Sequence, residues 1–329
     1  MKLLERVRDT MRLRHLSRKT EKAYTQWIVR FLRFHAQPGD DGHRIWKHPD
    51  QMGEAEVREF LTDLAVRGKV AASTQNQALA ALLLLFQQVL ERPLGRIDAL
   101  RARRPKRLPV VLSRDEVQRV LAALSGMPKL IAQLMYGSGM RVLEACSLRV
   151  QDLDIDRGQI LVRAGKGNKD RYAILPTCLR QAVVGQIEAR RLVHERDLSR
   201  GFGAAVLPEA FDRKDPSAAN DLRWQFLFPS ACRSEAAVPG GKTRWHVHEN
   251  VIGHAISRGG AAAGLTKRIT SHSLRHSFAT HLLESGYDIR TVQELLGHKN
   301  VETTMICTHV LQQGVLGVRS PLDAAGRAA

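Results

Sequence analysis

Residues 101–109 divide this chain of 329 residues into two parts of different character. The segment begins Arg101-Ala-Arg-Arg-Pro-Lys-Arg107 and ends at Pro109, so it combines dense positive charge with two prolines. Proline lacks a backbone N–H and interrupts helices, and clustered like charges repel one another. We therefore predict a linker at 101–109 between a first domain, residues 1–100, and a second domain, residues 110–329. A solvated surface loop is the alternative interpretation.

The first domain is predicted to be all-helical, with about four helices. Apolar side chains recur there at the spacing of one helix face: Ala23, Tyr24, Trp27, Ile28, Phe31 and Leu32. Ser17 precedes this run, with Glu21 four positions further on. Further helices are predicted over 53–65 and 73–90, the last ending before Pro93.

The second domain is predicted to mix helices with a small antiparallel sheet. Ser113 and Glu116 have the spacing of a capping box, and the following helix breaks at Gly137-Ser-Gly139. Residues 159–163 and 171–175 are predicted strands, joined by a glycine-containing turn. Residues 201–244 contain four prolines and show no clear period. The chain as a whole is therefore expected to be mainly α, with a small antiparallel β-sheet.

The charge of the chain indicates its class of partner. Lys and Arg total 51 against 33 Asp and Glu, a net charge of +18, and both halves carry the excess. A polyanion is the expected partner, because neutralised phosphates release counterions. A membrane surface is the rival, but no run reaches the roughly 18 apolar residues that span a bilayer; the longest, 78–86, is half that length. A nucleic acid held by both domains is the prediction from charge, and no membrane is expected as a partner.

The linker and the cysteines add two further expectations. The basic linker is expected to cross a DNA backbone, with four candidate contacts: Arg103, Arg104, Lys106 and Arg107. Four cysteines lie far apart without C-x-x-C spacing, which argues against a zinc site and for unpaired thiols in a reducing cytoplasm.

Five side chains in the second domain have the chemistry of a phosphodiester site. Arg141 follows a glycine break, Lys166 lies in Gly165-Lys-Gly167, His272 and Arg275 are three residues apart, and His298 follows Gly297. Guanidiniums bind phosphate oxygens bidentately and stay charged. A lysine can protonate a leaving oxygen, and a histidine can accept a proton from a nucleophile. Each motif alone is weak, but their order and spacing favour one site that needs neither a metal nor another cofactor.

In this order and spacing the chain resembles the tyrosine recombinases (the phage integrase family), including the Xer, Cre and lambda integrase groups. The resemblance covers nearly the whole chain. It implies a helical core-binding (SAM-like) domain and an α+β catalytic domain that form a C-shaped clamp, with four protomers synapsing two DNA sites. It also implies that Arg141 and Arg275 clamp the scissile phosphate, Lys166 is the general acid, His272 is the base and His298 hydrogen-bonds the phosphate. The family's reaction passes through a covalent 3′-phosphotyrosyl intermediate.

Other segments resemble the integron integrases, notably Arg18-Lys-Thr-Glu-Lys-Ala-Tyr24 and 207–230. That resemblance implies that an insertion, at about 201–244, recognises folded single-stranded DNA hairpins and their extrahelical bases at gene-cassette recombination sites. Trp224 then becomes a candidate stacking platform, although without the resemblance a core tryptophan is the simpler interpretation. The candidate DNA contacts of the insertion and its exit are Trp224, Arg244, Trp245, His246 and His248. The family's paired histidines are replaced here by Trp245-His246.

The chain departs from the family at the nucleophile. Nine residues after His298, where the family has its tyrosine, stands Cys307 in Met-Ile-Cys-Thr-His-Val. A cysteine side chain is shorter than a phenol and would form a weak P–S ester, so the prediction is a cleavage-defective recombinase. The alternatives are a working Cys307 thiolate and an architectural or regulatory DNA-binding protein that keeps the fold. A metal-dependent nuclease is disfavoured, because no acidic cluster has ligand spacing.

Overall fold

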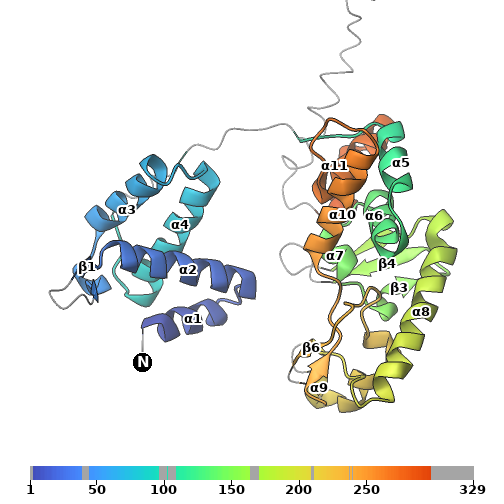
Figure 1. Cartoon of the computed structure of the whole chain (residues 1–329), viewed down its shortest axis with the longest axis horizontal. Helices are drawn as coiled ribbons and strands as arrows, with labels where there is room; N and C mark the ends of the chain where they lie inside the picture. Colours follow the sequence, from blue (N-terminus) through green and yellow to red (C-terminus); the bar gives the residue numbers. More distant parts are fainter. Residues whose placement is uncertain are drawn as a thin grey trace, which may run out of the picture. The chain divides into compact units, whose positions relative to one another are not determined.

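The structure is a computed structural model, and it describes residues 3–38, 44–95, 102, 109–163, 170–208, 211–236, 238 and 240–297. The chain divides into two compact units, Met1–Arg107 and Leu108–Ala329 (Figure 1). The predicted linker falls outside the described residues except for Ala102 and Pro109. In the described residues no helix is long and apolar enough to cross a membrane.

The first unit is a helical domain. Its helices are α1 (Leu3–Leu13), α2 (Arg18–Phe34), α3 (Glu54–Val66) and α4 (Ala72–Leu84), which continues as a π-helix over Leu85–Val89. A short pair of strands, β1 (Gln37–Pro38) and β2 (Arg44–Ile45), and a 3-10 turn at Pro49–Gln51 lie between α2 and α3. The three predicted helices are confirmed, and the strand pair was not predicted.

The core of the first unit explains why α2 forms where its apolar stripe lies. Phe31 is fully buried and makes edge-to-face contacts with Phe60 of α3 and Phe86 of the π-helix, with ring centroids 5.5 and 6.1 Å apart. Ser17 caps the helix by accepting a hydrogen bond from the backbone N–H of Thr20. The apolar face of α2 is therefore buried against α3 and the π-helix.

Asn76 of α4 fixes one residue of the linker to the first unit. Its carboxamide nitrogen donates to the backbone oxygen of Ala102, and its oxygen accepts from the backbone N–H of Ala102, both at 3.0 Å. This pairing imitates the two hydrogen bonds that a residue pair exchanges in an antiparallel ladder, so both backbone polar groups of Ala102 bind α4.

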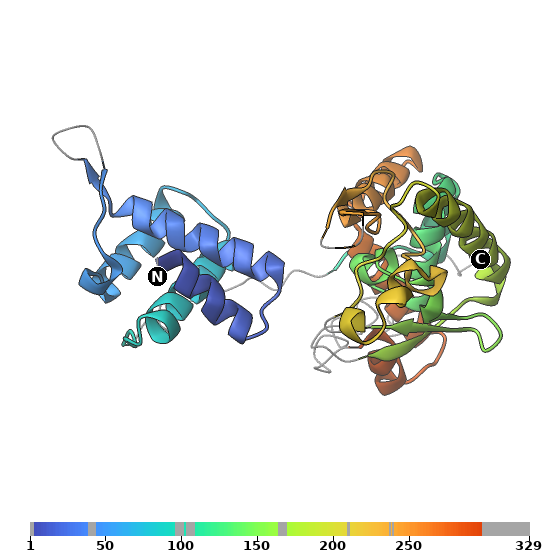
Figure 2. The same cartoon turned by 90° about the horizontal axis from the view of Figure 1, so that it is seen from below.

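The second unit packs helices around a small sheet, as predicted. Its helices are α5 (Arg114–Ala122), α6 (Gly126–Ser138), α7 (Val142–Cys146), α8 (Arg180–Leu198), α10 (Glu249–Ala262), α11 (Ser271–Glu284) and α12 (Ile289–Leu296). Strands β3 (Leu153–Asp154), β4 (Gln159–Val162) and β5 (Arg171–Ile174) form one antiparallel sheet, and α8 lies at the periphery of the unit (Figure 2). Short 3-10 helices occupy Val150–Asp152 and Thr177–Leu179.

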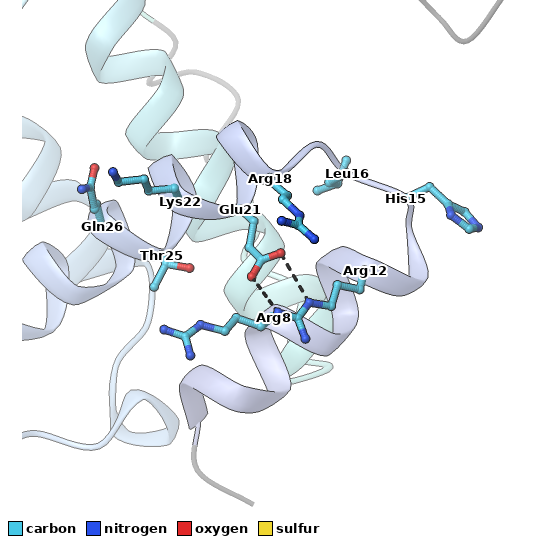
Figure 3. A pocket seen from close by; sticks show the side chains of 9 residues that line it. All are labelled: Arg8, Arg12, His15, Leu16, Arg18, Glu21, Lys22, Thr25 and Gln26. Carbon is cyan, nitrogen blue, oxygen red and sulfur yellow. Dashed lines mark hydrogen bonds and ion pairs between the residues drawn. The ribbon is translucent and has the colours of Figure 1, made fainter. Parts of the chain in front are cut away.

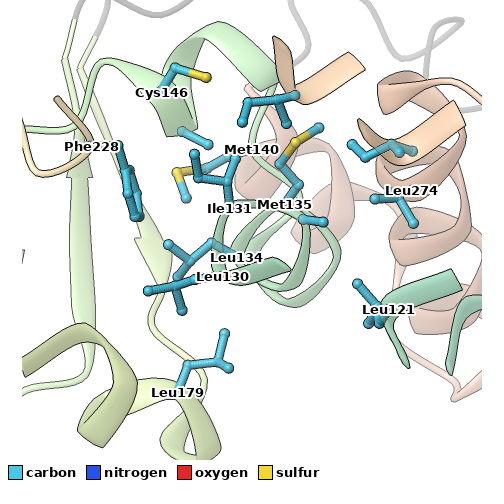
Figure 4. Close-up of a cluster of buried hydrophobic side chains, with 14 of the residues drawn as sticks. Leu121, Leu130, Ile131, Leu134, Met135, Met140, Cys146, Leu179, Phe228 and Leu274 are labelled. Carbon is cyan, nitrogen blue, oxygen red and sulfur yellow. The ribbon is translucent and has the colours of Figure 1, made fainter. Parts of the chain in front are cut away.

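Helix α6 forms the centre of the second unit's core. Its residues Leu130, Ile131, Leu134 and Met135 are buried between Phe228 on one side and Leu274 of α11 on the other (Figure 4). Cys146 is buried in the same cluster, and burial raises the pKa of its thiol to about 12. Cys146, Cys178 and Cys232 are free, which confirms the unpaired interpretation for these three.

The segment that showed no period forms a small subdomain. It contains α9 (Phe211–Lys214), 3-10 helices at Pro216–Asn220 and Leu222–Trp224, and the strand pair β6 (Ser234–Glu235) and β7 (Lys242–Thr243). A separate apolar cluster fills it, formed by Ala204, Leu207, Ala218 and Ala219 with Phe211, Trp224 and Val238 against them. Its backbone is attached to α8 by the buried Arg190, which donates from Nε to the oxygen of Phe226 at 3.1 Å.

Candidate phosphate-binding site

The turn between α6 and α7 places Arg141 at the edge of the core. Helix α6 ends at Gly139, whose φ of 67° is the left-handed conformation of a helix C-cap. A Cβ on Gly139 would lie 2.5 Å from the ring of Phe278, so only glycine fits this turn. Arg141 follows as the N-cap of α7, with 22% of its side chain exposed. The glycine break predicted from sequence is therefore the turn that positions Arg141 at the start of α7.

Glu144 is the centre of a cluster of arginines. It accepts from the backbone N–H of Arg141 at 2.8 Å, from Arg141 Nη1 at 2.6 Å, and from Arg171 Nη1 and Nη2 at 3.1 and 2.7 Å. Arg275 Nη1 lies 3.8 Å from the same carboxylate. Burial raises the pKa of Glu144, but hydrogen bonds and charge from Arg171 and Arg141 outweigh it and lower the pKa to about 2. Glu144 is therefore ionised at neutral pH and holds three guanidiniums together.

The end of α12 closes the cluster. Arg171 Nε donates to the oxygen of Leu295 at 3.1 Å, and Arg275 Nη2 donates to the oxygen of Leu296 at 2.5 Å. Arg275 Nη1 also donates to the oxygen of Gly139. The last carbonyls of a helix carry its negative dipole end, so cations are stabilised there. Residues of α7, β5, α11 and α12 thus meet at one place. Arg275 is nearly buried there, with 5% of its side chain exposed.

His272 lies one turn before Arg275 on α11. It keeps solvent access. The protein atoms packed around it, followed by the charges of Arg275 and Arg141, lower the pKa of His272 below its ordinary value. His272 is consequently neutral at pH 7 and able to accept a proton beside two permanent cations. The sequence prediction of this role is compatible with the geometry and stays a prediction.

Several predicted site residues lie outside the described part of the chain: Lys166, His298, Cys307, Arg103, Arg104, Lys106 and Arg107. The elements that lead to them are described. Strands β4 and β5 pair up to Val162 opposite Arg171, on either side of the segment with Lys166. Helix α12 ends in a left-handed Gly297, with a φ of 62°, directly before His298.

Trp224, the predicted stacking platform, packs inside the insertion. Its ring lies 4.9 Å from that of Phe211, and the Arg149 guanidinium lies 5.5 Å from its centroid. The side chain is half-buried in the insertion's apolar cluster. These contacts are those of a packing residue, the simpler interpretation offered by the sequence, and its stacking on a base stays a prediction.

The remaining insertion residues differ in their availability. Arg244 is 16% exposed and bound to Asp197 and to the backbone oxygens of Ser230 and Ala231. Trp245 is 36% exposed and stacks on Phe226 with centroids 6.1 Å apart. His246 contacts the edge of Phe226, and His248 is exposed as the N-cap of α10. Trp245 and His248 are therefore the more accessible of the predicted contacts.

A basic groove on the first unit was not identified from sequence. It has a volume of about 990 Å³ and is lined by Arg8 and Arg12 of α1 and by Arg18, Glu21, Lys22, Thr25 and Gln26 of α2, with His15 and Leu16 at the turn (Figure 3). Glu21 is paired with Arg12 at 3.3 Å. Basic side chains outnumber this single carboxylate, so the groove suits a phosphate backbone.

Glu144 and Arg171 are the site residues that sequence reasoning missed. Glu144 had a local signal, because it stands three residues after the N-cap Arg141, where a carboxylate can accept the hydrogen bond of the N-cap backbone N–H. Arg171 had none, since its partners lie 27 and 124 residues away. Among the residues that the structure describes, no group of three or more His, Cys, Asp or Glu side chains is arranged to hold a metal ion.

Comparison with known proteins bears on both units. Residues 110–313 match the phage integrase family, and residues 3–96 match the N-terminal SAM-like domain of phage integrases. An integrase/recombinase of Escherichia coli is 46% identical over 325 residues, covering 98% of this chain and 94% of that protein. Tyrosine recombinase XerC of Lactobacillus delbrueckii subsp. bulgaricus is 32% identical over 310 residues, covering 91% of each. A crystal structure of the XerH site-specific recombinase bound to difH substrate shares the fold, with a TM-score of 0.62 at 20% identity, covering 95% of this chain and 84% of that one.

Proposed function

The chain belongs to the phage integrase family of tyrosine recombinases, and we propose that it binds recombination sites in DNA with both units and holds a scissile phosphate at Arg141 and Arg275. The observation that carries the proposal is the convergence of Arg141, Arg275 and His272 beside the end of α12. Permanent cations that are partly shielded from solvent stabilise the charge that develops on phosphate oxygens.

With a tyrosine at position 307, the family's reaction would assign one step to each residue. A nucleophile attacks the phosphorus and forms a new ester bond to it, while the bond between the phosphorus and the 5′ oxygen breaks. The phosphorus stays attached to the 3′ oxygen of the cleaved strand. His272 accepts the proton of the nucleophile, and Lys166 donates a proton to the departing 5′ oxygen. His298 hydrogen-bonds a non-bridging oxygen. A second strand's 5′ hydroxyl then reverses these steps and completes strand exchange.

In this chain the nucleophile position holds Cys307, and we propose that cleavage is lost while DNA binding is kept. The thiol is shorter than a phenol and would not reach a phosphorus placed for tyrosine. A chain that binds without cutting is also the second candidate function, an architectural or regulatory DNA-binding protein. Assembly of four protomers on two sites is part of both proposals.

Covalent trapping tests the reaction. The unchanged chain and the Cys307→Tyr variant are incubated with nicked duplexes and folded hairpins of integron cassette type, and covalent adducts are separated by denaturing electrophoresis. The adduct is expected with Cys307→Tyr alone. A strong adduct with the unchanged chain would establish Cys307 as a working nucleophile. An inactive Cys307→Tyr variant that still binds DNA would favour the architectural function.

The integron subgroup is a finer proposal, supported by the insertion at 201–244. The subgroup proposal predicts that the protein binds the two separate strands of a cassette site with different affinities in gel-shift experiments. One folded strand should bind more tightly than the duplex. Equal binding of both strands and the duplex would remove the subgroup proposal and leave the family unaffected.

A further inference from the structure

Arg171 connects two elements that each hold a proposed phosphate ligand. It is the first residue of β5, and its guanidinium makes three hydrogen bonds. Nη1 and Nη2 reach both oxygens of Glu144, at 3.1 and 2.7 Å, and Nε reaches the backbone oxygen of Leu295 at 3.1 Å. A planar fork can make all three bonds at once, whereas a lysine ammonium offers one point of attachment.

The end of α12 also packs directly on the stem of Arg171. A Cβ placed on Gly297 would lie 3.0 Å from Arg171 Cδ. Arg171 is 11% exposed, and Glu144 is 10% exposed. The contact is therefore part of the packed interior and fixes the relative positions of α7, β5 and α12.

The charges in this cluster are arranged in a way that affects phosphate binding. Glu144 is a single carboxylate beside Arg141 at 2.6 Å and Arg275 at 3.8 Å, the two guanidiniums proposed to bind the phosphate. Arg171 donates one hydrogen bond to each oxygen of this carboxylate. Without Arg171, Glu144 would interact more strongly with Arg141 and Arg275 and would compete with a phosphate for them, because charge interactions are strong where solvent is scarce.

We propose that Arg171 is a positioning residue, which neutralises Glu144 and anchors the end of α12 so that Arg141 and Arg275 stay available to a DNA phosphate. The proposal rests on the proposed function, because it assumes that these two arginines bind a phosphate.

The test measures how much one phosphate contributes to DNA affinity, so it needs no cleavage. A duplex that binds the unchanged chain tightly is selected from a random-sequence pool. Ethylation interference on the unchanged chain and on Arg141→Ala identifies the phosphate whose contribution depends on Arg141. That phosphate is then replaced by a neutral methylphosphonate, and the ratio of the two Kd values is determined for each variant.

We expect a ratio of at least about 10 for the unchanged chain, as for a hydrogen-bonded charge contact. Arg171→Gln should lower the ratio at least about 3-fold, and Arg171→Lys should lower it less. Adding Glu144→Gln to Arg171→Gln should raise the ratio again, since the competing carboxylate is gone. Arg191→Gln, at an exposed arginine of α8 paired with Glu188 and Glu195, is the matched control and should leave the ratio unchanged.

Three outcomes would overturn the inference or its premise. An unchanged ratio in Arg171→Gln would show that Arg171 has no influence on the phosphate. A ratio in the double variant that is no higher than in Arg171→Gln would show that Arg171 does not act by neutralising Glu144. No phosphate dependent on Arg141 in the unchanged chain would refute the proposed function itself, and with it the role of Arg171.

Discussion

Arg244 donates from Nε and Nη2 to the two carboxylate oxygens of Asp197, at 2.7 and 2.9 Å. Asp197 lies near the end of α8, and Arg244 lies at the exit of the insertion, so the pair holds the insertion to the helix. Arg233 adds a third charge, with Nη1 3.5 Å from Asp197. Burial raises the pKa of Asp197, but the hydrogen bonds and charge of Arg244, together with the charge of Arg233, lower it below its ordinary value.

The first prediction concerns this ion pair. Asp197→Ala should destabilise the second unit by about 3 kcal/mol, because it leaves the mostly buried Arg244 and Arg233 without their counter-charge. Glu195→Ala, on the same helix, removes an exposed pair with Arg191 and should cost less than about 1 kcal/mol. Denaturant unfolding followed by circular dichroism measures both. Similar values for the two variants would contradict a structural role for Asp197.

The second prediction is a loss of stability in acid. Burial, followed by the charges of His272 and Arg275, lowers the pKa of His276 from 6.5 to about 4. Between these values the unfolded chain binds a proton that the folded chain does not, so stability falls as the pH drops from 6.5 to 4. The loss from this group is at most about 3 kcal/mol. His276→Gln should reduce the pH dependence of unfolding across that window, and an unchanged slope would exclude a contribution from His276.

The third prediction isolates the close contact at Gly139. Both Gly139 and Gly126 have positive φ, 67° and 58°, but only at Gly139 would a Cβ meet other atoms, at 2.5 Å from Phe278 and 2.9 Å from Leu296. Gly126→Ala should cost about 1 kcal/mol from backbone strain alone. Gly139→Ala should cost more and should also weaken DNA binding, because Gly139 supplies an oxygen to Arg275. Equal costs would refute the contact.

The fourth prediction addresses the basic groove of the first unit. Arg18→Ala and Lys22→Ala should each weaken DNA binding to a similar extent across sequences and lower the slope of log K against log salt by about 1. Arg58→Ala, on α3 and outside the groove, should leave the slope unchanged. Fluorescence anisotropy over a salt series provides the slopes. A slope that is insensitive to Arg18 and Lys22 would place the groove outside the DNA interface.

Sequence patterns predicted the parts of the fold that depend on local periodicity. The helix containing Trp27 and Phe31 and the strands before and after Lys166 follow from spacing alone. The structure of the insertion was not predicted, because polar bonds at irregular sequence separations hold it: Gln225 donates to the backbone oxygens of Gly203 and Ala219, at 2.9 and 3.2 Å. No period in sequence encodes such bonds.

The candidate site shows the same division. The glycine turn before Arg141 and the one-turn spacing of His272 and Arg275 were visible in the sequence, because they are local. The contact of Arg171 with Glu144 and Leu295 depends on the tertiary placement of β5 and α12. It became visible only once these elements were placed in three dimensions.

The pairing of Asn76 with Ala102 has a consequence for how the two units bind together. In the second unit the N–H of Leu112 is also fixed, by a 2.9 Å hydrogen bond to Ser277 Oγ. Ala102 and Leu112 are ten residues apart in sequence, so their Cα atoms lie at most ~36 Å from each other. Once one unit is bound to a polymer, the other is confined near it at an effective concentration that can reach the millimolar range. Each unit then needs only a weak affinity of its own for the whole chain to stay bound. One unit remains attached while the other dissociates and rebinds.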